Sequence, residues 1–132
     1  MNIANLTIVR DAIAADSPDH PAFLMAHFRG SAPVGSAHKC GTSACIGGMA
    51  LAIFHPEVWK DLDSPDNDPD GLMLECLGLT DDQGDVLFYT FCDDEAAALK
   101  HLTYVIENPA KWEEAVEQGG AEFRAMERAV LA

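Results

Sequence analysis

The chain has 132 residues, 48% of them hydrophobic, and carries 22 Asp and Glu against eight Lys and Arg, for a formal net charge of −14. This length suffices for one domain with its own core, and the hydrophobic content excludes wholesale disorder. We therefore expect a single globular domain over residues 1–132. The strong negative charge argues against direct binding to nucleic acid or to anionic membranes.

The compartment follows from the absence of targeting signals in this sequence. No apolar run has the length needed to span a bilayer. The first seventeen residues contain Arg10 and Asp11 within their apolar part and lack a basic start, so we do not interpret them as a signal peptide. We expect a cytoplasmic protein whose four cysteines stay reduced.

Short helices are predicted near the N-terminus. Leu6, Val9 and Ile13 recur at helical spacing and predict a first helix that ends near residues 17–18, a Ser-Pro pair. Proline is favourable in the first turn of a helix, so a second helix is expected over residues 21–28, which begin with proline.

The middle of the chain combines a third helix with an acidic loop. The helix is expected to begin after Thr42 or Ser43, either of which can cap it, and to run to Ile53. Residues 61–70, DLDSPDNDPD, are too polar and too rich in proline for regular structure and are predicted to form an acidic loop. A short helix then follows and ends at Gly78.

A further helix opens with a capping box. Thr80 and Gln83 have the required spacing, in which each side chain accepts a hydrogen bond from the backbone of the other residue. This helix is expected to carry Val86, Leu87 and Tyr89.

The last helices are recognised from apolar residues at helical spacing. Asp93 is expected to cap one helix, and Asn108-Pro109 to start another that Gly119-Gly120 bends or breaks. A minor strand pair is expected near residues 34–40 or 86–92. The predicted fold class is all-α, or mostly α with a minor β-hairpin, in a compact bundle of short helices.

The stretch HKCGTSACIGGMA, residues 38–50, contains three candidate metal ligands, and His55 follows as a fourth. Zinc takes four ligands in a tetrahedron, and His38, Cys40, Cys45 and His55 could supply them. The two cysteines are separated by four residues rather than the usual two, and Cys76 and Cys92 stand alone. We therefore expect no cofactor, with zinc as the alternative.

Two other chemistries fit the same stretch. Cys45 in a first helical turn could act as the nucleophile of a cysteine-dependent hydrolase, with His101 or His55 as the base. The helix start at residues 42–48 could bind a nucleotide-like small molecule through its backbone N–H groups, although the P-loop lysine is absent. The structural alternative is that Gly47 and Gly48 only allow another helix to pack closely against this one.

Calcium is a weaker alternative in the acidic loop. Asp66, Asp68, Asp70 and Gly71 match the first half of an EF-hand loop, but Leu77 replaces the bidentate glutamate. We therefore expect a solvated acidic loop rather than a calcium site.

The negative charge is concentrated in the second half of the chain. Residues 61–132 hold 18 of the 22 acids, and no basic side chain lies between Lys60 and Lys100. A field of one sign attracts basic protein surfaces, and carboxylates on one face could imitate the phosphates of a nucleic acid. The predicted partner-binding residues are Asp61, Asp63, Asp66, Asp68, Asp70, Asp81, Asp82, Asp85, Asp93 and Asp94.

Several motifs follow one another between residues 20 and 105. They are Phe23-Leu24-Met25, Cys40-Gly41-Thr42-x-x-Cys45-Ile46-x-Gly48, Leu77-Gly78-Leu79, Leu87-Phe88 and Glu95-Ala96-Ala97-Ala98-Leu99. This order resembles a family of small uncharacterised proteins of phages, prophages and related bacteria. The resemblance implies a mobile-element context, in which small acidic proteins often inhibit host defences.

Charge and resemblance together predict a binding protein rather than an enzyme. We expect a non-enzymatic phage-type inhibitor that binds a basic surface of a host protein, as an anti-CRISPR or other anti-defence protein acting by nucleic-acid mimicry. The prediction also allows a homodimer.

Overall fold

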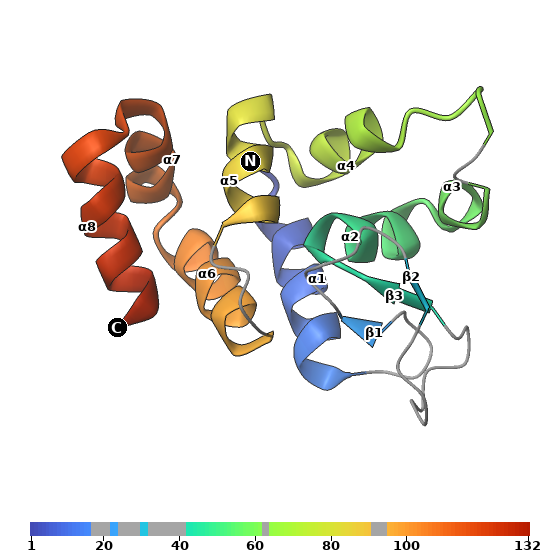
Figure 1. The fold of residues 1–132 in the computed structure, drawn as a ribbon, viewed down its shortest axis with the longest axis horizontal. Coiled ribbons are helices and arrows are strands. Elements are labelled where there is room, and N and C mark those ends of the chain that lie inside the picture. Colours follow the sequence, from blue (N-terminus) through green and yellow to red (C-terminus); the bar gives the residue numbers. More distant parts are fainter. Residues whose placement is uncertain (17–21, 24–29, 32–41, 62–63, 91–94) are drawn as a thin grey trace.

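The computed structural model describes residues 1–16, 22–23, 30–31, 42–61, 64–90 and 95–132 (Figure 1). Eight helices and three very short strands form within these residues. The predicted mostly helical fold is thereby confirmed. No helix in the described ranges has both the length and the apolar character needed to cross a membrane.

Helix α1, Ile3–Ala15, confirms the first predicted helix. The side chain of Asn2 caps it by accepting a hydrogen bond from the backbone N–H of Asn5 at 3.0 Å. Leu6, Val9 and Ile13 are buried, as the helical spacing predicts.

Three short strands form a small sheet. They are β1 (Ala22–Phe23), β2 (Gly30–Ser31) and β3 (Thr42–Ala44), in the order β1-β3-β2. β1 runs parallel to β3, whereas β2 is antiparallel to it. The predicted second helix is therefore wrong at Ala22 and Phe23, because this segment pairs with residues about twenty positions away.

The sequence predicted a strand pair at positions other than those of the observed strands. Residues 34–40 lie outside the described residues. Residues 86–89 belong to a helix, so a strand there is wrong. Helical hydrogen bonding in that segment follows from the cap at its start, and a short apolar run does not by itself distinguish a helix from a strand.

Helix α2, Ile46–Phe54, begins later than predicted because Thr42–Ala44 is taken up by β3. Helix α3, Pro56–Lys60, follows directly and buries Val58 and Trp59. Its first residue is a proline, whose missing N–H costs nothing in the first turn of a helix.

Helices α4, Pro69–Leu77, and α5, Asp81–Tyr89, are joined by a tight turn. The predicted acidic loop ends two residues early, because Asp68 caps α4 and Pro69 is its first residue. Gly78 ends α4 in the left-handed conformation, as predicted. The Thr80–Gln83 capping box is also confirmed, since both of its hydrogen bonds are present.

Three helices complete the chain: α6 (Glu95–Glu107), α7 (Pro109–Gln118) and α8 (Gly120–Leu131). Gly119, with φ of 64° and ψ of −157°, separates α7 from α8, so the predicted interruption is a complete break. Asp93, the predicted cap of α6, lies outside the described residues. The α7–α8 pair packs against α6, and α6 packs against α1 (Figure 1).

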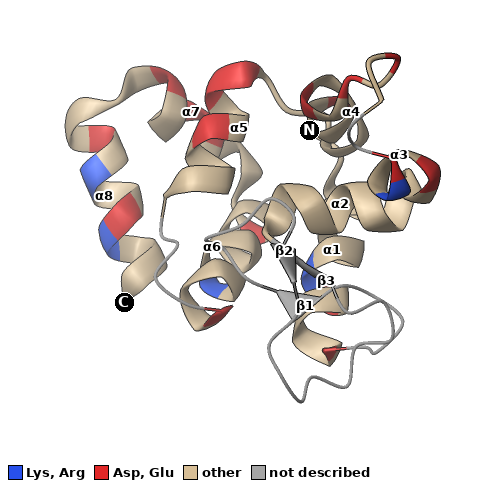
Figure 2. Ribbon diagram, turned by 45° about the vertical axis from the view of Figure 1, so that its right-hand side comes forward, with Lys and Arg blue, Asp and Glu red and all other residues tan. Residues whose placement is uncertain are grey.

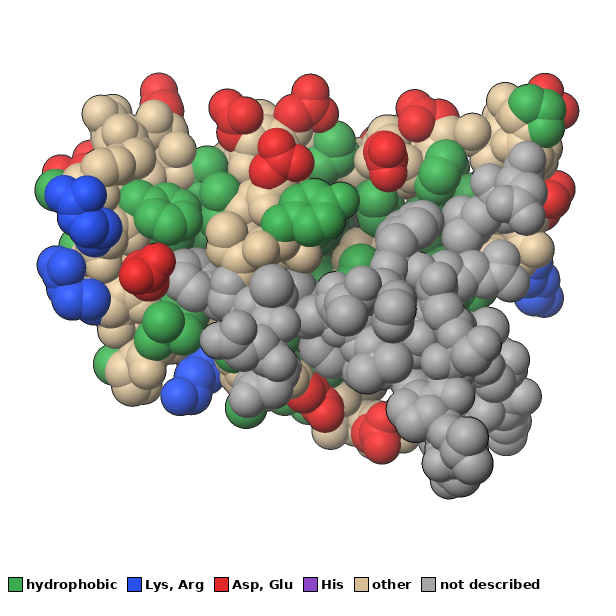
Figure 3. All heavy atoms as spheres, in the orientation of Figure 1, with side chains coloured by type: hydrophobic (Ala, Val, Ile, Leu, Met, Phe, Trp, Pro, Cys, Tyr) green, Lys and Arg blue, Asp and Glu red, His purple; other side chains and the backbone are tan. Residues whose placement is uncertain are grey.

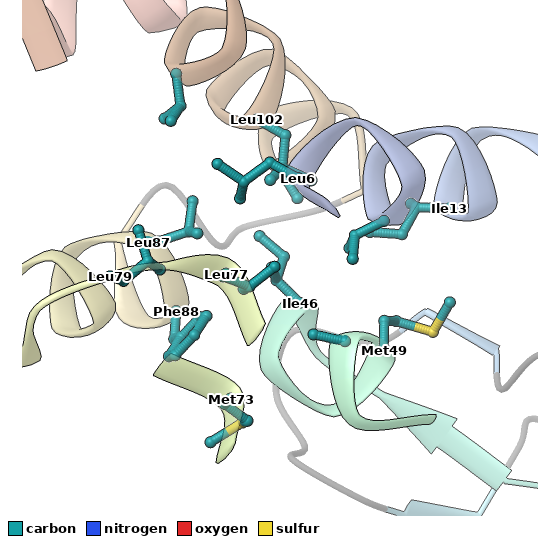
Figure 4. Packing of buried hydrophobic residues seen from close by; sticks show 14 of the residues in the cluster. Leu6, Ile13, Ile46, Met49, Met73, Leu77, Leu79, Leu87, Phe88 and Leu102 are labelled. Atoms are coloured by element: carbon teal, nitrogen blue, oxygen red, sulfur yellow. The ribbon is translucent and has the colours of Figure 1, made fainter. Parts of the chain in front are cut away.

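One cluster of buried hydrophobic side chains includes members from all eight helices. Ile46 and Leu77 lie next to each other in its middle, where α2 meets α4 (Figure 4). Leu6 and Leu102 lie on one side of this pair, and Phe88 lies on the other (Figure 4). This core holds α4 and α5 in fixed positions beside α2.

Candidate functional site

The predicted zinc ligands are not brought together in the described part of the chain. His38 and Cys40 lie outside it, whereas Cys45 precedes α2 and His55 follows it. A helix rises about 1.5 Å per residue, so the Cα atoms of Cys45 and His55 are roughly 15 Å apart, too far for both side chains to bind one zinc ion. Among the described residues, no group of three or more His, Cys, Asp or Glu could hold a metal ion.

Cys45 is buried, with 8% of its surface exposed. Burial raises the pKa of its thiol, and the backbone N–H groups of Gly48 and Gly47, which act in the opposite direction, do not offset this effect. The reactive form of cysteine is the thiolate, so a raised pKa disfavours nucleophilic catalysis. The surroundings of Cys45 therefore favour a structural role.

The two histidines proposed as a base for Cys45 lie elsewhere. His55 is at the other end of α2, where its Nδ1 is 3.7 Å from Oε1 of Glu57. His101 is on α6, which packs mainly against α1, α7 and α8, and its Nε2 accepts a hydrogen bond from Nε1 of Trp112 at 2.9 Å. The described contacts thus engage both histidines in roles other than activating a thiol.

Gly47, at the start of α2, has a packing role. A Cβ atom on Gly47 would lie 2.5 Å from Sδ of Met73 and 3.6 Å from the ring of Phe88, so α2 approaches α4 and α5 closely here. Residues 45–48 are all buried. This contact supports the close-packing interpretation of Gly47, and binding of a nucleotide-like molecule at residues 42–48 stays a prediction.

The acids before α4 differ in their surroundings. The carboxylate of Asp68 accepts a hydrogen bond from the backbone N–H of Gly71 at 3.2 Å and caps the helix. The backbone carbonyl of Asp61 accepts one from the side chain of Asn67 at 2.6 Å. Asp66 is exposed in the turn between them. Asp70 and Gly71 are already helical, so the second half of a calcium-binding loop is replaced by α4.

Three of the predicted partner-binding acids meet at one groove. The groove lies between α4 and α5 and has a volume of about 210 Å³. Its acidic lining is Asp70, Asp81 and Asp85. Its other lining residues are Met73, Leu74, Gly84, Phe88 and Tyr89. Figure 3 shows acidic side chains gathered over α4 and α5, with hydrophobic side chains beside them.

Helical periodicity explains why these residues share the groove. On α5 the lining residues recur at steps of three and four, from Asp81 through Gly84 and Asp85 to Phe88, so they form one face. Asp82 does not line the groove. Gly84 matters for its shape, because a Cβ atom there would collide with Cδ2 of Leu74 on α4.

The carboxylates of the groove have no compensating cation among the residues that the structure describes. Asp70, Asp81 and Asp85 are exposed, and no described basic side chain pairs with any of them. Figure 2 shows the α4 and α5 ribbons with acidic positions and without a basic one. Asp70 and Asp81 lie in first helical turns, where the positive end of the helix dipole stabilises negative charge.

The aromatic part of the groove was not predicted from the sequence. Tyr89 lies in the predicted helix, and 73% of its surface is exposed. Phe88 is buried and forms part of the groove together with Met73. The repeat of lining residues from position 81 to 89 was visible in the sequence as a helical face, but only the placement of α4 beside it makes that face a groove.

The remaining predicted contact residues are Asp63, Asp93 and Asp94, which lie outside the described residues.

Comparison of the chain with protein-family models, with curated proteins and with solved structures found no match. The resemblance to small phage and prophage proteins therefore depends on the sequence motifs alone.

Proposed function

We propose that the protein is a non-enzymatic binding protein that recognises a basic surface of another protein. The contact surface is the acidic face, which we define as Asp70, Asp81, Asp82 and Asp85 on α4 and α5. The observation that supports this proposal is that these four exposed carboxylates gather on neighbouring helices with no described basic side chain paired to them.

The biological form of the proposal is inhibition of a host defence protein in the cytoplasm. Proteins that handle nucleic acids carry basic grooves, and a rigid set of carboxylates can occupy such a groove in place of phosphates. An anti-CRISPR or related anti-defence role agrees with the net charge of −14 and with the phage-like motif order. The buried thiol of Cys45 and its raised pKa make a hydrolase the weaker candidate.

Electrostatics of this kind acts mainly on recognition and on the rate of association. An exposed ion pair contributes about 0–1 kcal/mol, so a few such pairs steer the partner rather than supply all of the affinity. The affinity of such a complex is expected to fall as salt increases, because counterions screen exposed charges.

The test is capture of partners from a bacterial lysate by three immobilised proteins. They are the wild type, an acidic-face variant with Asp70, Asp81, Asp82 and Asp85 changed to Asn, and a control with four other exposed acids, Glu114, Glu117, Glu122 and Glu127, changed to Gln. The net charge changes by the same amount in both variants, because each loses four carboxylates. Capture is compared at about 50 mM and about 300 mM NaCl, with partners identified by mass spectrometry.

We expect a basic partner to be retained at low salt by the wild type and by the control but not by the acidic-face variant. Circular dichroism of all three proteins verifies that they are folded. Equal retention by the wild type and the acidic-face variant would sink the proposal, as would equal loss in both variants.

A further inference from the structure

We propose that the groove between α4 and α5 receives an arginine side chain of the partner protein. This inference rests on the proposed function, because it names the group of the basic partner that the acidic face recognises. It is argued from the size, the charge and the aromatic lining of the groove.

The size of the groove fits one side chain. Its volume is about 210 Å³. Sites for drug-sized ligands are larger, at about 300–1,000 Å³. A nucleotide or a folded element of the partner would therefore extend well beyond this groove, whereas one long side chain can lie within it.

The charges of the groove fit a guanidinium group. Asp81 and Asp85 are one helical turn apart, which places their Cβ atoms about 6 Å from each other on the same face of α5. Asp70 adds a third carboxylate, from α4. A planar guanidinium group donates up to five hydrogen bonds in a fixed arrangement and can therefore bind more than one carboxylate.

The aromatic and apolar lining favours arginine over lysine. The methylene groups of a long basic side chain can pack on Phe88 and Met73, while its charged end stays near the carboxylates. Tyr89 presents an exposed ring at the same groove, on which a guanidinium group can stack. The ammonium group of lysine is more strongly hydrated and stacks less well.

The experiment is an NMR titration of the full-length protein with three synthetic peptides. Each peptide has a Gly-Ser backbone with three identical residues at fixed positions, which are arginine, lysine or citrulline. Citrulline keeps the shape of arginine and removes its charge. We expect the arginine peptide to shift the backbone signals of α4 and α5, to bind about fivefold more tightly than the lysine peptide, and to lose binding when citrulline replaces arginine.

Matched variants separate the groove from the general negative charge. Asp85→Asn should weaken binding of the arginine peptide about fivefold, whereas Glu75→Gln, at an exposed position of α4 outside the groove and outside the acidic face, should change it less than about twofold. Tyr89→Ala should weaken binding, and Tyr89→Phe, which keeps the ring, should retain it. The spectrum of each variant also reports directly on whether it is folded.

The outcomes distinguish this inference from the proposed function. Equal binding of the arginine and lysine peptides, or equal effects of Asp85→Asn and Glu75→Gln, would overturn the groove proposal and leave the acidic face as a general contact surface. Arginine-selective binding in the groove, combined with failure of salt-dependent capture by the acidic face, would contradict the proposed function instead.

Discussion

His101 is a buried group whose ionisation is coupled to folding. It is 1% exposed, and burial lowers its pKa to about 4. In the unfolded chain its pKa is about 6.5, so the unfolded state binds more protons than the folded state between those two values. We expect the free energy of unfolding to decrease as the pH falls from about 6.5 to about 4, by up to about 3 kcal/mol from this residue. Urea denaturation at several pH values measures this change in the free energy of unfolding.

The control for this prediction is His101→Gln, which keeps an acceptor for Nε1 of Trp112 but cannot be protonated. The quantity of interest is the difference between the two proteins, because any other effect of acidification is common to both. We expect the wild type to lose more stability than the variant on acidification. Parallel pH profiles would show that His101 is not responsible.

Cys45 provides a second test at the scale of one residue. Its burial and raised pKa predict slow alkylation by iodoacetamide near neutral pH, at least about tenfold slower than that of an unstructured thiol. The modification is followed by tandem mass spectrometry, which separates Cys45 from Cys40 in the same peptide. The unfolded protein in urea is the reference. Fast alkylation of Cys45 in the native protein would revive the thiol-enzyme hypothesis.

At the scale of elements, the end of α4 is joined to the start of α1. The backbone N–H of Asn2 donates to the carbonyl of Leu77 at 2.9 Å, and the side chain of Asn5 donates to the carbonyl of Cys76 at 2.6 Å. Gly78 follows directly, with φ of 66°, and a Cβ atom there would lie 2.7 Å from the backbone nitrogen of Asn2. This junction therefore requires glycine for two separate reasons.

We expect Gly78→Ala to lower the free energy of unfolding by about 3 kcal/mol, from the left-handed conformation and from the collision with Asn2. Gly120 also has a positive φ, of 54°, but a Cβ atom added there would meet no other atom within 4 Å. Gly120→Ala should therefore cost only about 1 kcal/mol. Urea denaturation of both variants gives the comparison. Equal losses would show that the contact with Asn2 contributes nothing.

Elements whose cause is local were predictable from the sequence. The capping box of Thr80 and Gln83, the end of α4 at Gly78 and the break at Gly119 each depend on residues within one helical turn. Strand β1 was not predictable, because Ala22 and Phe23 pair with Ser43 and Ala44, far along the chain. The apolar letters of this segment fit a helix and a strand equally well.

The candidate site was predictable only in part for the same reason. The list of acids contained Asp70, Asp81 and Asp85, since charge is visible in the sequence. Their convergence depends on the way that α4 and α5 pack beside α2, and on Gly84, which lets Leu74 approach α5. The exposure of Tyr89 at the groove depends on the same packing.

At the scale of the whole molecule, a single hydrophobic core supports a very uneven distribution of charge. The core cluster draws on all eight helices of the described chain. Residues 61–132 nevertheless hold 18 acids and only four basic side chains. The core must therefore offset electrostatic repulsion on the part of the surface that we propose for binding.

This repulsion predicts that moderate salt stabilises the protein. Raising NaCl from about 20 mM to about 200 mM shortens the screening length from about 20 Å to about 7 Å, so we expect the free energy of unfolding to rise by about 1 kcal/mol. Screening also weakens the favourable interaction of Asp81 and Asp82 with the helix dipole. That interaction extends over only one helical turn, whereas the repulsion from the net charge of −14 acts across the surface. The acidic-face variant should therefore show a smaller increase than the wild type in urea denaturation at the two salt concentrations. A decrease in stability with salt would mean that the carboxylates are held by favourable local interactions, and a basic partner would then gain little by pairing with them.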